Sequence, residues 1–238
     1  MKLNVSKCKQ MTFSRTDVPS FAYNIGNNVV ERVDSFKDLG VLMDPKLSFN
    51  LHINKIINKA SRTLGLIKRW AKEFKDPYAT KLLYTSVVRP ILEYASPVWC
   101  PRYQSHIDSI ESVQKQFLLF CLRHLGWDPN LPLPCYRSRL KLIDLPTLHS
   151  RRTMLNVSFV FNLLNGDVRC DFLLHKLSFS VPTRPSRYFS FFKLEYFTLN
   201  YLNFNPFRAA LVDFNNHYKN LNLNMSIFSV KKNCLKSS

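Results

Sequence analysis

Four cationic side chains share one face of a predicted helix, and their spacing suits the phosphates of a nucleic-acid backbone. They are Lys55, Lys59, Arg62 and Arg69. On an ideal helix they fall within about 80° of one another and extend over about 21 Å. Cations spaced in this way can neutralise successive phosphates without reading the bases. The alternative is a solvated helix face; Leu66, which falls among the cations, slightly favours contact with a ligand.

The helix that would position these cations is predicted from about residue 51 to residue 74, with Ser48 as its N-terminal cap. Apolar residues recur along it at three- and four-residue steps, on the side opposite the cations. They are Ile53, Ile56, Ile57, Ala60, Leu64, Ile67, Ala71 and Phe74. One apolar and one basic face indicate packing on one side and contact with a polyanion on the other.

Short extended runs precede this helix. The last two, residues 35–38 and 41–44, meet at Gly40, while residues 9–14, 21–25 and 29–33 alternate and predict further strands, with a proline turn at 17–20. Two or three such strands are barely stable by themselves. We therefore expect them to belong to a larger sheet, and the start at Met1 to lie inside a bigger domain.

Helices dominate the rest of the chain. Asp76-Pro77 begins one whose apolar pattern is interrupted by Pro90, and Ser105 and Asp108 form a capping box for the next, which Gly126 ends. The pattern of the first is Ala79, Leu82, Leu83, Ser86, Val87, Leu92, Tyr94 and Ala95. Three such helices predict an antiparallel bundle. Further helices are predicted at residues 136–143, 145–165 and 206–218. The fold class is thus mainly α with a small N-terminal antiparallel β element, an α+β chain.

Two groups of aromatic residues could serve either packing or function. Residues 178–205 are rich in aromatic and basic residues, which suits a core or, less commonly, a platform for stacking single-stranded bases. The three tryptophans, Trp70, Trp99 and Trp127, are expected in the core or at the edge of the bundle.

Composition narrows the functional classes. The 238 residues carry 34 Lys and Arg against 16 Asp and Glu, a formal charge of +18 that favours phosphate backbones or anionic surfaces. No apolar run is long enough to cross a membrane, and the N-terminus lacks the apolar core of a signal peptide. The six cysteines and six histidines show no metal-ligand spacing. We expect an intracellular protein of the nucleus or cytoplasm, neither secreted nor membrane-bound, without a metal site.

Several short motifs, in combination, resemble the downstream part of non-LTR, jockey-like LINE retrotransposon reverse transcriptases. Each is weak alone, but together they cover nearly the whole chain. Those of the first half are Asn4-x-x-Lys7, Lys37-Asp38-Leu39-Gly40-Val41, His52-Ile53 and Leu83-Tyr84-x-Ser86-x-x-Arg89-Pro90-x-Leu92-Glu93-Tyr94. Those of the second half are Ile110-Glu111-x-Val113-Gln114, Leu145-Pro146-Thr147-Leu148-x-x-Arg151-Arg152 and Leu164-Asn165-Gly166.

The resemblance implies three domains. Residues 1–47 would be the end of the palm with a primer-grip-like hairpin, 48–126 a thumb-like three-helix bundle, and 135–238 a helical C-terminal extension. Lys7 would assist departure of pyrophosphate, and only in a complete enzyme. The implied partners are an RNA or DNA primer–template and the upstream polymerase region. The residues that would contact nucleic acid are Lys37, Leu39, Gly40, Lys55, Lys59, Arg62 and Arg69.

The resemblance also bears on activity. Polymerases hold two metal ions with paired carboxylates, and in this family the pair is an aromatic-x-Asp-Asp turn. No Asp-Asp dipeptide occurs in the chain. We therefore expect this chain to need no cofactor and to lack polymerase activity, whereas a complete family member uses Mg²⁺.

Two other functions remain open. The chain could be a helical protein-interaction module, which salt-insensitive binding to a protein would favour. It could also be a decayed relic of an element with no selected function, which the absence of cooperative unfolding would favour. At single positions, Lys7 could be a solvated lysine and Gly40 an ordinary hairpin glycine.

Overall fold

The computed structural model describes residues 4–16, 19, 21–71, 73, 76–101, 103–128, 130–181, 190–203 and 205–217. Phe74, Tyr188, Phe189 and most of the predicted turn at 17–20 lie outside the described residues. The chain divides into two compact units, Met1–Lys59 and Ala60–Ser238, with the boundary inside one helix. The division into 1–47, 48–126 and 135–238 stays a prediction.

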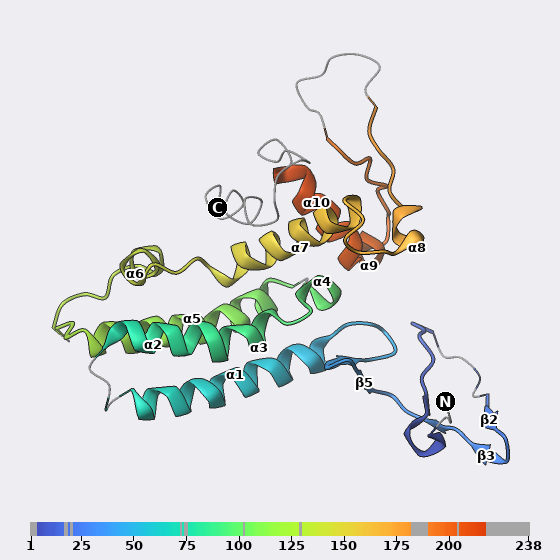
Figure 1. Ribbon diagram of the computed structural model, residues 1–238, viewed down its shortest axis with the longest axis horizontal. Helices are drawn as coiled ribbons and strands as arrows, with labels where there is room; N and C mark the ends of the chain where they lie inside the picture. The colour runs from blue at the N-terminus through green and yellow to red at the C-terminus, as the bar shows by residue number, and fades with distance from the viewer. Residues whose placement is uncertain are drawn as a thin grey trace. The chain divides into compact units, whose positions relative to one another are not determined.

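The described residues of the first unit form three small strand pairs and the 3-10 turn η1 (Val5–Lys7). β2 (Asn24–Ile25) pairs with β3 (Asn28–Val29), and β5 (Phe36–Asp38) with β6 (Val41–Met43), both antiparallel. β1 (Lys9–Gln10) runs parallel to β4 (Glu31–Arg32). The mainly α character with small β elements is confirmed (Figure 1). The purely antiparallel arrangement is wrong for β1 and β4, because these strands pair across an intervening hairpin instead of a direct turn.

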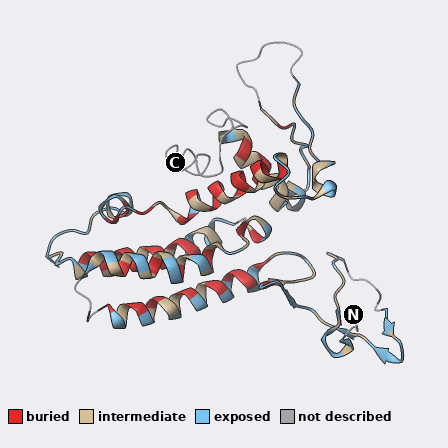
Figure 2. Cartoon of the chain, in the orientation of Figure 1, coloured by how far each residue is buried: buried red, intermediate tan, exposed pale blue. Residues whose placement is uncertain are grey.

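Helix α1 (Asn50–Trp70) follows the β5–β6 hairpin. Asp44 Oδ1 accepts from the backbone N–H groups of Ser48 (2.8 Å) and Phe49 (3.0 Å), and Ser48 Oγ accepts from Asn50 N at 3.4 Å. These bonds satisfy donors at the helix start, where the backbone has no intrahelical partner. The described residues of the predicted apolar face are buried except for Ile57, which is half-buried, and buried and exposed positions alternate around α1 in Figure 2.

The second predicted helix is built from several pieces. They are α2 (Pro77–Leu83), the π-helical segment η2 (Tyr84–Val88), α3 (Arg89–Glu93) and α4 (Ser96–Trp99). Asp76 caps α2 as predicted, accepting from Tyr78 N at 2.9 Å. Pro90 cannot donate a backbone hydrogen bond, and the helix widens into η2 just ahead of it.

The buried face of this segmented helix differs from the predicted one. Leu82, Val87 and Tyr94 are exposed, as is Ser86. The residues that point inward follow four-residue steps: Thr80, Tyr84, Val88 and Leu92. The prediction is confirmed at Leu92 and wrong at the exposed positions, because the four-residue steps of the buried face differ from the predicted spacing and the hydroxyl groups of Thr80 and Tyr84 find hydrogen-bond partners.

Helix α5 (Gln104–His124) runs antiparallel to α2 and α3, as Figure 1 shows. Its N-cap is Tyr103, without a side-chain capping bond, so the capping box at Ser105 and Asp108 is wrong. Gly126 ends the helix with φ of 79°, as predicted. Helix α6 (Tyr136–Ile143) has the predicted bounds. Helix α7 (Leu148–Leu164) begins a few residues later than predicted, because the Thr147 side chain caps it by accepting from Ser150 N at 3.0 Å.

A buried polar network ties α5 to η2, α6 and α7. The Tyr84 hydroxyl donates to Gln114 Oε1 at 2.9 Å, and Gln114 Nε2 donates to the Pro146 carbonyl at 2.9 Å. Glu111 Oε1 accepts from the Tyr136 hydroxyl and, at 3.1 Å, from Leu148 N at the start of α7. Burial, and then the charge of Glu111, raise the pKa of Tyr84, so that its hydroxyl stays a donor. The helices on both sides of residue 127 therefore share one interior.

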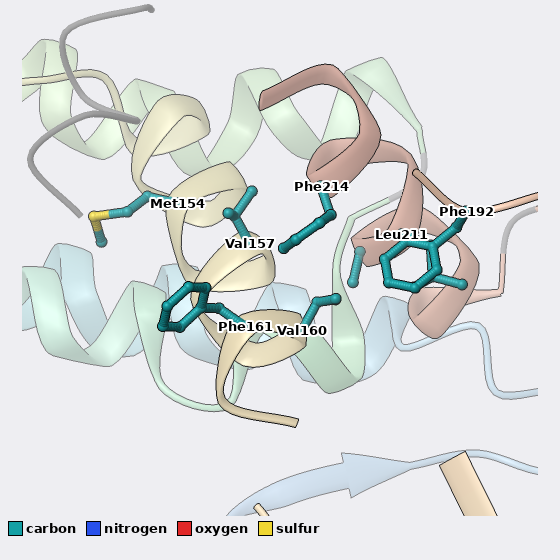
Figure 3. Packing of buried hydrophobic residues seen from close by; sticks show 8 residues of the cluster. Met154, Val157, Val160, Phe161, Phe192, Leu211 and Phe214 are labelled. Carbon is teal, nitrogen blue, oxygen red and sulfur yellow. The ribbon is translucent and has the colours of Figure 1, made fainter. Parts of the chain in front are cut away.

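A second core lies between α7 and α10 (Pro206–His217), with α8 (Asp171–Leu174) and α9 (Asn200–Asn203) nearby in the chain. Figure 3 shows Phe214 pointing toward Val157, and Phe192 beside Leu211. The aromatic run thus contributes to a core through Phe192, which is fully buried. Tyr196 on the same run is 87% exposed, so packing does not account for every aromatic residue in it.

Candidate nucleic-acid interface

The hairpin of β5 and β6 turns in two residues. Asp38 pairs with Val41, so that Leu39 and Gly40 form the loop with φ of 43° and 92°. Positive φ at both central positions defines a type I′ turn, which matches the twist of the two strands. Lys37 and Leu39 are exposed, whereas Val41 is buried. Gly40 is exposed as well, so the hairpin displays its three predicted contact residues and is anchored by the buried Val41.

Leu39 occupies an unfavourable position for its residue type. A left-handed conformation costs a non-glycine residue roughly 1–2 kcal/mol, and Asn or Gly is the common choice in this turn. Leu39 nevertheless stands there with 85% of its surface exposed. A strained, exposed, large apolar residue at a hairpin tip is the kind of outlier that accompanies functional contacts.

His52 connects the hairpin to the first turn of α1. Leu42 N in β6 donates to His52 Nδ1 at 3.2 Å, which places the ring proton on Nε2. Burial, and then the nearby charge of Lys55, lower the pKa of His52, so that the ring stays neutral and keeps accepting this bond. The sequence indicated His52 only as part of a motif, and its role as an anchor follows from the structure.

The predicted cations line one side of α1. This helix carries five Lys and Arg residues and no acidic residue among its 21 residues. Lys55, Lys59, Arg62 and Arg69 are all exposed. None of the ion pairs found among the described residues involves Lys55, Arg62 or Arg69. Their charges are therefore not neutralised by acidic side chains in that part of the chain, as a phosphate-binding face requires.

Three apolar side chains accompany these cations. Leu51, Leu66 and Trp70 are 56%, 40% and 56% exposed, and helical periodicity puts them on the cationic side of α1. The exposure expected for Leu66 is confirmed. Trp70 is not a core residue; Trp99, by contrast, is buried. The phase of the helix already separates Leu51 and Trp70 from the apolar arc, so the sequence contains a signal for their exposure that the prediction did not use.

Lys7 lies apart from these residues in the chain. It ends the turn η1, where its backbone N–H donates to the Asn4 carbonyl at 3.1 Å, and its side chain is exposed. The role that the resemblance implies for Lys7 stays a prediction.

Among the described residues, no group of three or more His, Cys, Asp and Glu side chains is placed to hold a metal ion. The full sequence contains no adjacent aspartates. No helix in the described part is long and apolar enough to cross a membrane.

Comparison with known proteins places the chain near mobile-element polymerases. A curated "RNA-directed DNA polymerase from mobile element jockey" of Drosophila melanogaster is 27% identical over 121 residues. The protein of the same description from Drosophila funebris is 26% identical over 121 residues. The chain matches no protein-family model and no solved structure. It is therefore related to a jockey-like LINE reverse transcriptase region.

The match covers only a small part of each relative's length. The matched residues are 50% of this chain and 13% of each relative. The relation supports descent from a reverse transcriptase of a transposable element.

Proposed function

We propose that this chain is a nucleic-acid-binding region of a jockey-like reverse transcriptase, which grips the backbone of an RNA or DNA primer–template. The exposed cations of α1 follow the phosphates, and the tip of the β5–β6 hairpin contacts the primer. The observation that supports this most directly is the acid-free helix α1 with four exposed cations on one side. Its relation to two RNA-directed DNA polymerases supplies the class of ligand.

The proposed region binds without catalysing polymerisation. The support for this is that the sequence contains no Asp-Asp dipeptide, whereas two bridging Mg²⁺ ions require paired carboxylates. We expect no template-directed DNA synthesis by the purified chain with Mg²⁺ or Mn²⁺. Incorporation that persists through rigorous repurification would refute this. Catalysis, and any role of Lys7 in it, would require an upstream polymerase region as partner.

The binding face is tested by removing its charge. Replacing Lys55, Lys59, Arg62 and Arg69 with Gln should weaken primer–template binding evenly across sequences. It should also lower the slope of log affinity against log salt by up to about 0.9 for each phosphate that the variant no longer neutralises. Fluorescence anisotropy with a labelled duplex, over a series of salt concentrations, measures both quantities.

A matched variant separates a site from a diffuse positive field. Arg123, Arg137, Lys141 and Arg169 are exposed cations on other parts of the chain, and replacing them with Gln removes the same charge. We expect this control to reduce the affinity and the salt slope clearly less. Equal reductions in the two variants would show that no defined face exists.

The hairpin is tested by relieving its strain. Asn tolerates the left-handed region better than Leu, so Leu39→Asn should stabilise the turn while removing its apolar tip. We expect slower amide exchange in β5 and β6 together with weaker primer–template binding. Unchanged binding would remove Leu39 from the interface. Val29→Asn, at another exposed apolar position of a small strand, is the control for a general reduction of apolar surface.

A further inference from the structure

A hollow of about 420 Å³ lies in the C-terminal section, and its lining residues are far from α1 along the chain. Its lining includes three cations, Lys176, Lys193 and Arg208, against one carboxylate, Glu195. Phe197 and Phe207 add two aromatic side chains. All of these residues belong to the described part of the second unit.

The backbone that carries these side chains is held in place by specific hydrogen bonds. Lys193 N donates to the Ser178 carbonyl at 2.8 Å, which joins the segment of Lys176 to that of Lys193. Asn215 on α10 bonds both the N–H and the carbonyl of Phe192, each at 2.9 Å. The segment on which Lys193 stands is therefore fastened to α10 as well.

Two of the cations, Arg208 and Lys176, and the backbone of Phe197 have specific partners. Arg208 Nε donates to the Glu195 carbonyl at 3.1 Å, and its Nη1 donates to the Asn203 carbonyl at 3.2 Å. The Asn203 side chain bonds the backbone N–H and carbonyl of Phe197. Lys176 Nζ lies 4.2 Å from the centre of the Phe172 ring. A site whose groups are held before binding loses less entropy when a ligand arrives.

We propose that this hollow binds one unpaired nucleotide of a single-stranded nucleic acid. Its phosphate lies against Lys176, Lys193 and Arg208, and its base packs on Phe197 and Phe207. Single-strand-binding proteins combine these two elements, a positive groove and aromatic side chains. The volume falls within the range of small-ligand sites. This site differs from the face of α1 proposed above in its ligand. The hollow would bind an unstacked base, whereas the face of α1 would contact the backbone of a duplex.

Charge variants of the full chain test the phosphate contacts. Lys193→Gln and Lys176→Gln should each weaken binding of a labelled oligothymidylate and lower its salt slope by about 0.7. Glu195→Gln removes the one acidic group of the lining and should strengthen binding. Lys141→Gln removes an exposed cation on α6 and should have little effect. Equal effects of the Lys141 and Lys193 substitutions would overturn the site.

Aromatic variants test the base. Phe197→Leu should weaken oligothymidylate binding about fivefold or more, while Phe197→Tyr, which keeps the ring, should restore it. Blunt duplex binding through α1 should be unchanged in both variants, so that a failure of this site is distinguishable from a failure of the proposed function. An equal reduction of single-strand and duplex binding would overturn the proposal.

Competitors identify the chemistry of the occupant. An abasic oligonucleotide should compete much less well than oligothymidylate of the same length. Equal competition would show an anion site that ignores the base, and equal competition by a polyglutamate peptide would show a site for acidic peptides. Either result would overturn the proposal.

Discussion

Gln114 is the branching point of the buried network, and its replacement by Leu tests whether that network holds the helices together. The side chain is fully buried on α5. It accepts from the Tyr84 hydroxyl at 2.9 Å and donates to the Pro146 carbonyl at 2.9 Å and the Tyr136 hydroxyl at 3.3 Å. Leucine has a similar size but offers no donor or acceptor, so the packing is nearly kept while the hydrogen bonds disappear.

The expected cost follows from the groups left without a partner. Tyr136 keeps its bond to Glu111, but the Tyr84 hydroxyl and the Pro146 carbonyl lose Gln114. A buried polar group without a partner costs about 1–3 kcal/mol. Tyr84 is fully buried, whereas Pro146 is only half-buried and its carbonyl has easier access to water. We therefore expect Gln114→Leu to lower the free energy of unfolding by roughly 2–4 kcal/mol.

A double-mutant cycle isolates one bond of the network. Tyr84→Phe alone leaves the Gln114 carbonyl oxygen without its donor, whereas in the Gln114→Leu background the hydroxyl has already lost its acceptor. The two effects should therefore couple by about 1–3 kcal/mol. Urea unfolding followed by circular dichroism supplies each free energy.

The control is Gln116→Leu, the same substitution at an exposed position of the same helix. It should change stability by no more than about 0.5 kcal/mol. A cost of Gln114→Leu as small as that of the control, or strictly additive effects in the cycle, would refute the network as a source of stability.

Three further outcomes are expected. Leu64→Ala, at a buried position of α1, should lower the free energy of unfolding by about 2–5 kcal/mol, whereas Leu66→Ala, at an exposed position, should lower it by about 0.5 kcal/mol or less. Equal losses would show that the buried face of α1 is assigned wrongly. Burial raises the pKa of Asp213, so its contribution to stability should fall as pH rises from about 3.9 through the raised value, and a pH titration of unfolding should lose this dependence in Asp213→Asn. Because the pKa of His52 is lowered, protection of the Leu42 amide against hydrogen exchange should be complete above about pH 6.5 and decline below it. If the protection factor does not change with pH, His52 does not anchor the hairpin.

Local sequence signals predicted much of the helical architecture. Asp76 and Pro77 marked the start of α2, and Gly126 marked the end of α5, because capping and left-handed φ depend on residues close in sequence. The buried face of α1 followed from its periodicity, since apolar residues there coincide with the packed side.

The features that could not be predicted from the sequence depend on contacts between residues far apart in the chain. The inward turn of Tyr84 depends on Gln114, thirty positions later, and no local pattern announces that bond. The same holds for the hollow near α10, where Lys193 and Arg208 converge only because separate segments are bonded together. Of the candidate interface, the sequence predicted the cations of α1 but not the strain at Leu39, which requires backbone angles.

The residues singled out in this chain divide into a buried group and an exposed group, and the proposed binding concerns the exposed group alone. Gln114 and Glu111 are buried and hydrogen-bonded inside the helical unit, and the Arg151 side chain pairs with Glu93 through two bonds. Folding alone accounts for such residues, because breaking a buried pair leaves a costly unpaired charge or polar group. Their replacement would reduce ligand binding by lowering the stability of the fold, without any contact to nucleic acid. The tip at Leu39 and the four cations Lys55, Lys59, Arg62 and Arg69 are, by contrast, exposed on the surface. Function must therefore be tested at these exposed positions, with stability measured in the same variants.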